Sequence, residues 1–209
     1  MNLKIILLYI SFLILLKFCH QTNAIDTNKS CLIHNLHYSH EYLYAQIMTK
    51  NDNRNFTPNV FTYPLDKVEN FTKITWMFMP LKVNDIQIIY LNRKVYLIKS
   101  GDNEHDYLCS TDFHSKISPK RRILRLFKIT DNDKLKYQKC FWTLQLKDES
   151  KNEYVIRNMN GESMYAASFF FNAGWFKRSV YLWASKDGFN SKKSKWIIDC
   201  SKGEFIYSK

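Results

Sequence analysis

The chain has 209 residues, with 31 Lys and Arg against 19 Asp and Glu, and its formal net charge is +12 at pH 7. A chain of this length folds as one ordinary domain or, less easily, as two very small ones. Its five glycines are scattered, so neither a phosphate-binding loop nor a nucleophile elbow can be assembled from them. We therefore expect a non-catalytic protein without a cofactor, and the excess of positive charge indicates an acidic partner.

The first 24 residues are typical of a secretory signal peptide. One early positive charge, Lys4, precedes the apolar run 5–16 and a polar stretch that ends at Ala24, which is the order of such a leader. The apolar run is shorter than the roughly 20 residues that cross a bilayer. We expect residues 1–24 to be removed and residues 25–209 to form a single secreted, extracellular domain.

Export would place the chain in an oxidising compartment. Without the leader four cysteines remain, and an even number favours two disulfides. They are Cys31, Cys109, Cys140 and Cys200. Sequons for N-glycosylation begin at Asn28, Asn55 and Asn70, although Pro58 directly after the second makes that one a poorer acceptor. A secreted glycoprotein is the expected product.

Three tryptophans mark an internal repeat. Trp76, Trp142 and Trp196 lie in similar apolar runs, and 15 residues before each stands another apolar pair, ending at Phe61, Phe127 and Tyr181. Leu43, Leu108 and Met164 precede the same tryptophans by 33, 34 and 32 residues, and a further apolar run lies about ten residues earlier. Because β-branched and aromatic residues dominate these runs, they predict an all-β protein of twelve strands. The repeats span about 31–81, 86–147 and 154–200.

Three four-stranded units resemble the β-trefoil, in which six strands form a closed barrel capped at one end by three hairpins. The first and last strands of a trefoil are neighbours, so the resemblance implies a Cys31–Cys200 disulfide and leaves Cys109 to pair with Cys140. The short, basic, disulfide-bonded chain is also similar to secreted trefoils of insects, including saliva and gut proteins.

Basic residues gather in two segments, and such clusters attract anionic ligands unless they form only a solvated face. One cluster precedes the third strand of the second unit and contains Lys120, Arg121 and Arg122. The other lies near the end of the chain and contains Lys177, Arg178, Lys186, Lys192, Lys193 and Lys195. Fibroblast growth factors, which are also trefoils, carry heparin-binding lysines in the corresponding last loops. We expect heparin-like sulfated glycan or an extracellular protein as partner, and no nucleic acid.

Two alternative functions come from other trefoils. A Kunitz-type protease inhibitor would present the basic stretch 118–122 as an exposed loop. A lectin of the ricin type would carry Gln two residues before each tryptophan, where this chain has Ile74, Cys140 and Ser194. The aromatic stretch 169–176 would form either a contact patch or core beneath a hairpin. His34, His37 and His40 are expected to be polar residues of a strand and turn rather than metal ligands.

Overall fold

The computed structural model describes residues 25, 29–46, 60–81, 94–115, 118–130, 137–168, 177–183 and 191–201. Several sequence-based predictions fall on other residues: the leader, the sequons at Asn28 and Asn55, Lys186 and the aromatic stretch 169–176. They lie outside the described residues, as does the start of the second repeat at 86.

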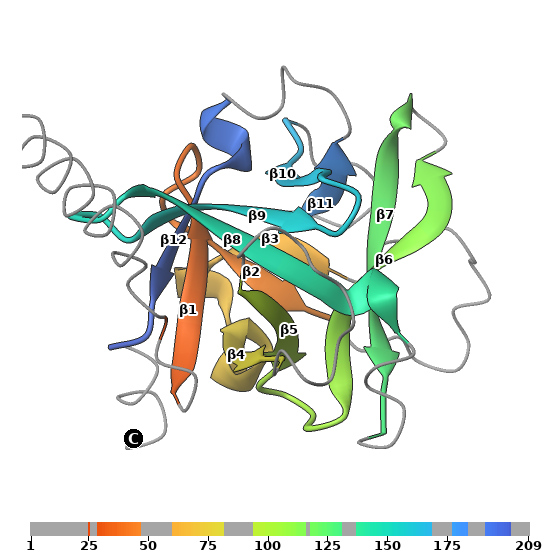
Figure 1. Cartoon of the computed structure of the whole chain (residues 1–209). Coiled ribbons are helices and arrows are strands. Elements are labelled where there is room, and N and C mark those ends of the chain that lie inside the picture. The colour runs from red at the N-terminus through yellow and green to blue at the C-terminus, as the bar shows by residue number, and fades with distance from the viewer. Residues whose placement is uncertain are drawn as a thin grey trace, which may run out of the picture.

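The twelve predicted strands are present and fall into three consecutive units (Figure 1). The first unit holds β1 Ser30–Asn35, β2 Glu41–Ala45, β3 Val60–Pro64, the 3-10 turns η1 Leu65–Lys67 and η2 Phe71–Ile74, and β4 Thr75–Pro80. The second holds β5 Val95–Ser100, β6 Asp106–Ser115, β7 Ser118–Lys128, η5 Gln138–Cys140 and β8 Phe141–Asp148. The third holds β9 Glu153–Asn158, β10 Ser163–Ala166, β11 Arg178–Trp183, η6 Lys192–Ser194 and β12 Trp196–Asp199.

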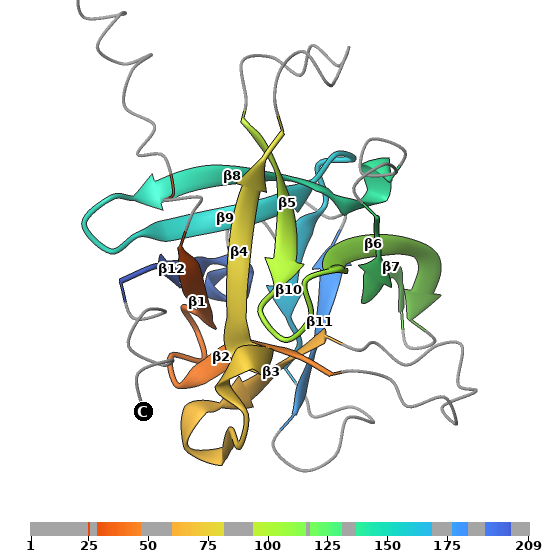
Figure 2. The same cartoon turned by 90° about the horizontal axis from the view of Figure 1, so that it is seen from below.

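The first and last strands of each unit close a six-stranded barrel. Antiparallel pairing runs from β1 to β4, β5, β8, β9 and β12, and β12 pairs with β1 again. Figure 2 shows two of these pairs, β4–β5 and β8–β9, running across one another. The remaining strands form the hairpins β2–β3, β6–β7 and β10–β11, and β11 also pairs with β3 and β7. This is the β-trefoil that the repeat predicted.

The three repeated tryptophans occupy equivalent buried positions, as predicted. Each indole is fully buried and its Nε1 donates to a backbone carbonyl of the second strand in the same unit. Trp76 donates to Leu43 at 2.9 Å, Trp142 to Leu108 at 2.8 Å and Trp196 to Met164 at 3.0 Å. The indoles fill the barrel core and tie each hairpin to it.

One part of the predicted repeat is wrong. Val60, Leu124 and Val180 face equivalent partners in the three hairpins and are all fully buried. Leu124 precedes its tryptophan by 18 residues, whereas Val60 and Val180 precede theirs by 16. The second unit is therefore two residues longer here, and Phe127, predicted to match Phe61, is 39% exposed. A strand has a period of two, so a two-residue shift leaves its apolar pattern unchanged.

Both predicted disulfides, Cys31–Cys200 and Cys109–Cys140, are formed. The first joins β1 to the residue that follows β12 and so reinforces the closure of the barrel. The second joins β6 to η5 within the second unit. No helix in the described part of the chain is long and apolar enough to cross a membrane.

Two Arg–Glu ion pairs join neighbouring units at equivalent positions. Nε of Arg122 lies 3.1 and 3.0 Å from the carboxylate oxygens of Glu162. Nε and Nη2 of Arg178 each lie 3.0 Å from an oxygen of Glu41. Each arginine stands two residues before the buried Leu124 or Val180. Both pairs are largely removed from solvent, where loss of one partner leaves an uncompensated charge.

The third interface departs from this pattern. Asp106 takes the position of Glu41 and Glu162, and the arginine's place falls on Pro58 in the sequence, outside the described residues. Asp106 is 7% exposed. Burial is the largest influence on its carboxyl group and raises the pKa, while Lys128 opposite it acts in the other direction. The fold therefore holds a carboxylate that is costly to ionise.

Replacing any of Trp76, Trp142 or Trp196 by Phe should lower the free energy of unfolding by about 1 to 3 kcal/mol, because a buried carbonyl loses its donor. Urea unfolding followed by circular dichroism measures the change. Trp183→Phe is the control, since Trp183 lies at the surface of β11 beside Arg121, and it should cost less. A repeated tryptophan that can be replaced without cost would contradict the equivalence.

Asp106→Asn should stabilise the protein at about pH 7 and have little effect at about pH 3. The folded state holds this proton more tightly than the unfolded chain, so ionisation of Asp106 weakens the fold above the raised pKa. That penalty disappears as pH falls through the pKa. Urea unfolding at both pH values tests this prediction, and Asp66→Asn, a change at an exposed carboxylate, is the control variant. An equal gain at the two pH values would disprove the assignment.

Candidate functional site

Several of the predicted basic residues form contacts within the fold. Arg178 and Arg122 form the Arg–Glu ion pairs between units, and Lys195 Nζ lies 2.7 Å from Glu153 Oε1. The guanidinium of Arg121 lies over the rings of Tyr181 and Trp183. The charges of Arg122, Arg178 and Lys195 are therefore compensated by acidic partners within the fold.

The other described members of the clusters keep their charge available. Lys120 and Lys192 are exposed. Lys193 Nζ lies 2.5 Å from Ser168 Oγ, a neutral acceptor. Lys177 donates to Gln46 Oε1 at 3.0 Å, and burial, with a smaller contribution from Lys73, lowers its pKa.

An open cleft of about 970 Å³ lies in the second unit, and sequence reasoning missed it. Its walls are the outer part of β6, the end of β7, η5 and the turn after β9. Three of the five large hydrophobic side chains exposed in the described part of the chain line this cleft. They are Phe113, Phe127 and Tyr137, which are 46%, 39% and 38% exposed.

A bulge in β6 turns Asp112 and Phe113 outward. Ser110 pairs with Leu124 and His114 with Arg122, so three residues of β6 stand opposite Ile123 alone. The buried Thr111 hydroxyl donates to the Ile123 carbonyl at 3.0 Å, and the Phe113 N–H donates to that hydroxyl at 3.2 Å. Bulges of this kind redirect side chains beside binding sites.

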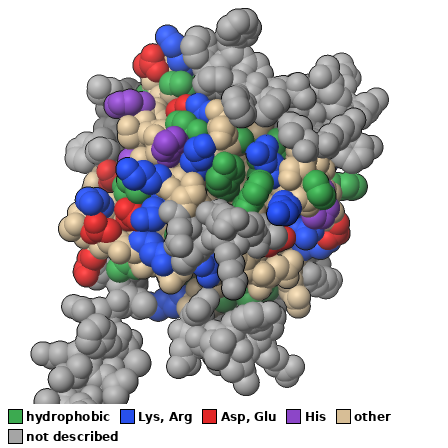
Figure 3. All heavy atoms as spheres, turned by 90° about the horizontal axis from the view of Figure 1, so that it is seen from above, with side chains coloured by type: hydrophobic (Ala, Val, Ile, Leu, Met, Phe, Trp, Pro, Cys, Tyr) green, Lys and Arg blue, Asp and Glu red, His purple; other side chains and the backbone are tan. Residues whose placement is uncertain are grey.

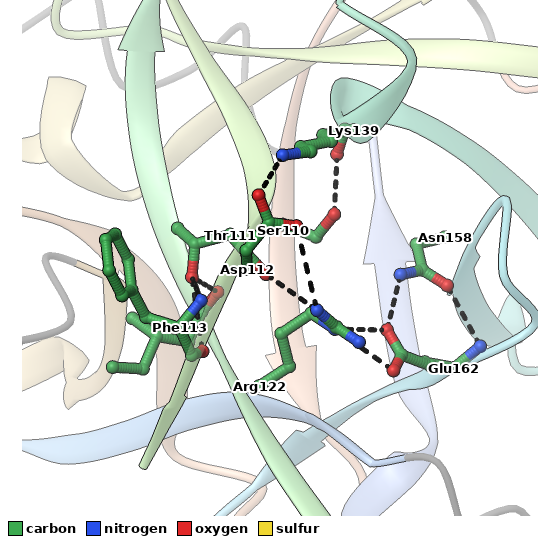
Figure 4. Close-up of polar contacts among 9 residues, drawn as sticks. Ser110, Thr111, Asp112, Phe113, Arg122, Lys139, Asn158 and Glu162 are labelled. Carbon is green, nitrogen blue, oxygen red and sulfur yellow. Dashed lines mark hydrogen bonds and ion pairs between the residues drawn. The ribbon is translucent and has the colours of Figure 1, made fainter.

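A polar network lies at the cleft near Phe113 (Figure 4). Lys139 Nζ contacts the Asp112 carboxylate, and the Ser110 hydroxyl donates to the Lys139 carbonyl at 3.0 Å. Arg122 reaches from Glu162 to the Thr111 carbonyl and lies 4.0 Å from Asp112. The hydrogen bond from Lys139 is the largest of the influences that lower the pKa of Asp112. Asp112 is thus held ionised at the mouth of the cleft.

The turn after β9 completes the wall. Asn158 Nδ2 donates to Glu162 Oε2 at 2.7 Å, and the Glu162 N–H donates to Asn158 Oδ1 at 2.9 Å. Gly161 lies within this turn at φ +79°, a conformation that suits glycine. The turn places Asn158, Met159 and Asn160 on the cleft. The disulfide Cys109–Cys140 holds β6 and η5 together on the opposite side.

The cleft combines flat apolar rings with fixed hydrogen-bonding groups. Exposed aromatic rings offer apolar faces for stacking, and carboxylate and amide groups accept and donate hydrogen bonds to hydroxyls. A small set of placed polar groups in an aromatic-lined concavity is typical of a small-ligand site. The two-residue shift of the repeat concealed that Phe127 is exposed. The signal that the sequence did contain for this cleft is Phe113, an isolated aromatic residue in a polar segment.

Of the remaining described candidate residues, the bonded pair Cys109 and Cys140 lines the cleft and the others do not. Ile74, Cys140 and Ser194 are buried at the ends of the 3-10 turns, and Cys140 is already bonded to Cys109. The basic stretch 118–122 belongs to β7, where Arg121 and Arg122 pair with β11. Asn70 is exposed and caps η2, with its Oδ1 accepting from Thr72, and its glycosylation stays a prediction. Among the described residues no His, Cys, Asp and Glu group could hold a metal ion.

No protein-family model and no curated sequence matches the chain. Several solved structures share the fold. An SDF2-like protein from Arabidopsis thaliana is 11% identical with a TM-score of 0.59, covering 81% of this chain and 92% of its own. A structure described as the BEL β-trefoil is 12% identical with a TM-score of 0.53, covering 85% and 97%. A Culex salivary protein of the cysteine and tryptophan-rich family is 15% identical with a TM-score of 0.53, covering 86% and 99%. These likenesses show a β-trefoil fold.

Proposed function

We propose that this is a non-catalytic extracellular protein that binds a glycan, with its saccharide rings in the cleft of the second unit. The observation that carries this proposal is the gathering of Phe113, Phe127 and Tyr137 around a cleft whose polar wall includes Asp112 and Asn158. Sugars present both an apolar C–H face and hydroxyl groups, so they require rings and hydrogen-bonding groups together. The two disulfides and the predicted leader support an extracellular location.

The charges in the cleft favour binding over hydrolysis. Glycoside hydrolysis needs one protonated carboxyl group to donate to the leaving oxygen. Lys139 keeps the pKa of Asp112 low, and both oxygens of Glu162 accept hydrogen bonds from Arg122. Asp112 is therefore not suited to donate a proton, whereas its ionised carboxylate accepts bonds from sugar hydroxyls.

A protease inhibitor of the Kunitz type receives less support. Such an inhibitor presents an exposed loop to the protease, whereas Arg121 and Arg122 form strand pairs with Trp183 and Leu182. Arg122 is also committed to Glu162 and Thr111. The segment would have to leave the sheet to enter a protease cleft.

We expect the mature protein to bind a defined set of glycans on an array. Phe127→Ala should lower the affinity for the best-bound glycan about tenfold, or about 1.4 kcal/mol, because a stacking contact is lost. Asp112→Asn should weaken the same ligand by removing a charged acceptor. Isothermal titration calorimetry measures both affinities.

The chain offers a matched control for each variant. Phe71 is 40% exposed on η2 and Asp66 is exposed on η1, away from the cleft lining. Phe71→Ala and Asp66→Asn should leave the affinity unchanged. The proposal fails if no glycan binds, or if the cleft variants and their controls bind alike.

A further inference from the structure

The third unit contains a counterpart of the cleft with a different charge. Lys193 precedes Trp196 by three residues, as Lys139 precedes Trp142. Ser168 follows the paired Ala166 by two residues, as Asp112 follows Ser110. The contact between Lys139 Nζ and Asp112 is therefore matched by the contact between Lys193 Nζ and Ser168 Oγ. The position of the Asp112 carboxylate in the second unit is thus occupied by the neutral hydroxyl of Ser168 in the third unit.

We name this counterpart the shoulder, and define it by His37, Ser168, Lys192 and Lys193. It lies between the turn that joins β1 to β2 and the turn η6, on the face shown in Figure 3, where Lys and Arg side chains gather near histidines. Neither Lys192 nor Lys193 forms an ion pair with another described residue. Within the described residues, no carboxylate belongs to the shoulder.

A buried asparagine holds the shoulder rigid. Asn35 is fully buried, and its Nδ2 donates to the carbonyls of Lys193 at 2.8 Å and Lys195 at 3.3 Å. Its Oδ1 accepts from the backbone N–H groups of His37 at 3.0 Å and Tyr38 at 3.3 Å. The same side chain thereby fixes the backbone that carries His37 and the backbone that carries Lys193. Because both segments are fixed before a ligand arrives, binding costs little ordering.

The surrounding charges leave the shoulder positive. Arg178 lies 3.7 Å from the ring centre of Tyr38, and Glu41 compensates its charge through both carboxylate oxygens. Lys195 is compensated by Glu153. Desolvation is the largest cause that lowers the pKa of His37, and the charges of Lys193, Lys192 and Arg178 lower it further. Repulsion among these cations decreases when an anion binds between them.

We infer that the shoulder binds the sulfate groups of an anionic glycan. Lysine ammonium groups bind such oxyanions as compact point charges. A sulfate stays ionised at mildly acidic pH, where His37 gains its proton. The charged groups of His37, Lys192 and Lys193 then attract the sulfate together. This inference rests on the proposed function for the class of ligand, but it concerns a second surface.

Heparin chromatography with a reciprocal exchange tests the assignment. Ser168→Asp gives the shoulder the carboxylate of the cleft and should lower the salt concentration that elutes the mature protein. Asp112→Ser frees Lys139 and should raise it. Lys94→Ser is the control, because it removes one charge from an exposed lysine outside the shoulder. Lys192→Ser combined with Lys193→Ser should lower the affinity for a heparin hexasaccharide at least about tenfold. The charge-matched control, Lys94→Ser combined with Lys120→Ser, should lower that affinity less.

Two further measurements test the role of His37 and the class of anion. Affinity for the hexasaccharide should rise as pH falls from about 7 to about 5, because bound sulfate favours the protonated form of His37. His37→Gln should remove this rise. A poly-glutamate peptide that binds more tightly than the hexasaccharide would overturn the inference.

Two further results would also overturn it: shoulder and control variants that elute alike, and a wild-type protein that is not retained at physiological salt. Phe71→Ala, outside both the cleft and the shoulder, should elute like the wild type. Failure of the shoulder appears as shoulder variants that elute like Lys94→Ser, whereas failure of the cleft appears as cleft variants that bind glycans like Phe71→Ala, so the two failures are distinguishable.

Discussion

The hydrogen bond between a buried indole and the carbonyl of a neighbouring strand is the interaction on which the rest of the structure depends. It occurs three times, from Trp76, Trp142 and Trp196. In each unit it joins the last barrel strand to the hairpin and so fixes the end of the barrel to the cap. An unpaired carbonyl in this core would cost more free energy than an ordinary surface hydrogen bond contributes. The 3-10 turn directly before each tryptophan is placed by the same contact.

The binding surfaces follow from these turns. Lys73, Lys139 and Lys193 each stand three residues before a repeated tryptophan, so the fold presents three related lysines. Their partners have diverged. Lys139 contacts a carboxylate and Lys193 contacts a hydroxyl. The cleft beside Lys139 is consequently near neutral, whereas the shoulder beside Lys193 is cationic. A symmetric framework can in this way offer different sites for different parts of one ligand.

The same threefold relation governs the joints between units. Arg122 with Glu162 and Arg178 with Glu41 occupy matching places. Arg122 also donates to the carbonyl of Thr111 in β6, and Arg178 to the carbonyl of Ala167, directly after β10. These ion pairs position the residues beside the cleft and the shoulder. At the third joint Asp106 remains, with the pKa of its carboxyl raised by burial. The joints have thus diverged as the surfaces have.

The sequence by itself determined the fold class and the threefold repeat, and the pairing of the four cysteines followed from the resemblance of that repeat to the β-trefoil. Apolar alternation and three tryptophans at similar spacing are local or periodic signals, and burial acts on them directly. Asn35 and Phe127 show where this reasoning ended. The repeat matched Phe127 with Phe61, because a period of two cannot reveal a two-residue insertion, and no sequence signal indicated a role for Asn35. Only the tertiary structure decided that Arg122, Arg178 and Lys195 are compensated by acids 40, 137 and 42 residues away. Such pairings depend on contacts between units, and charge counts along the chain do not contain them.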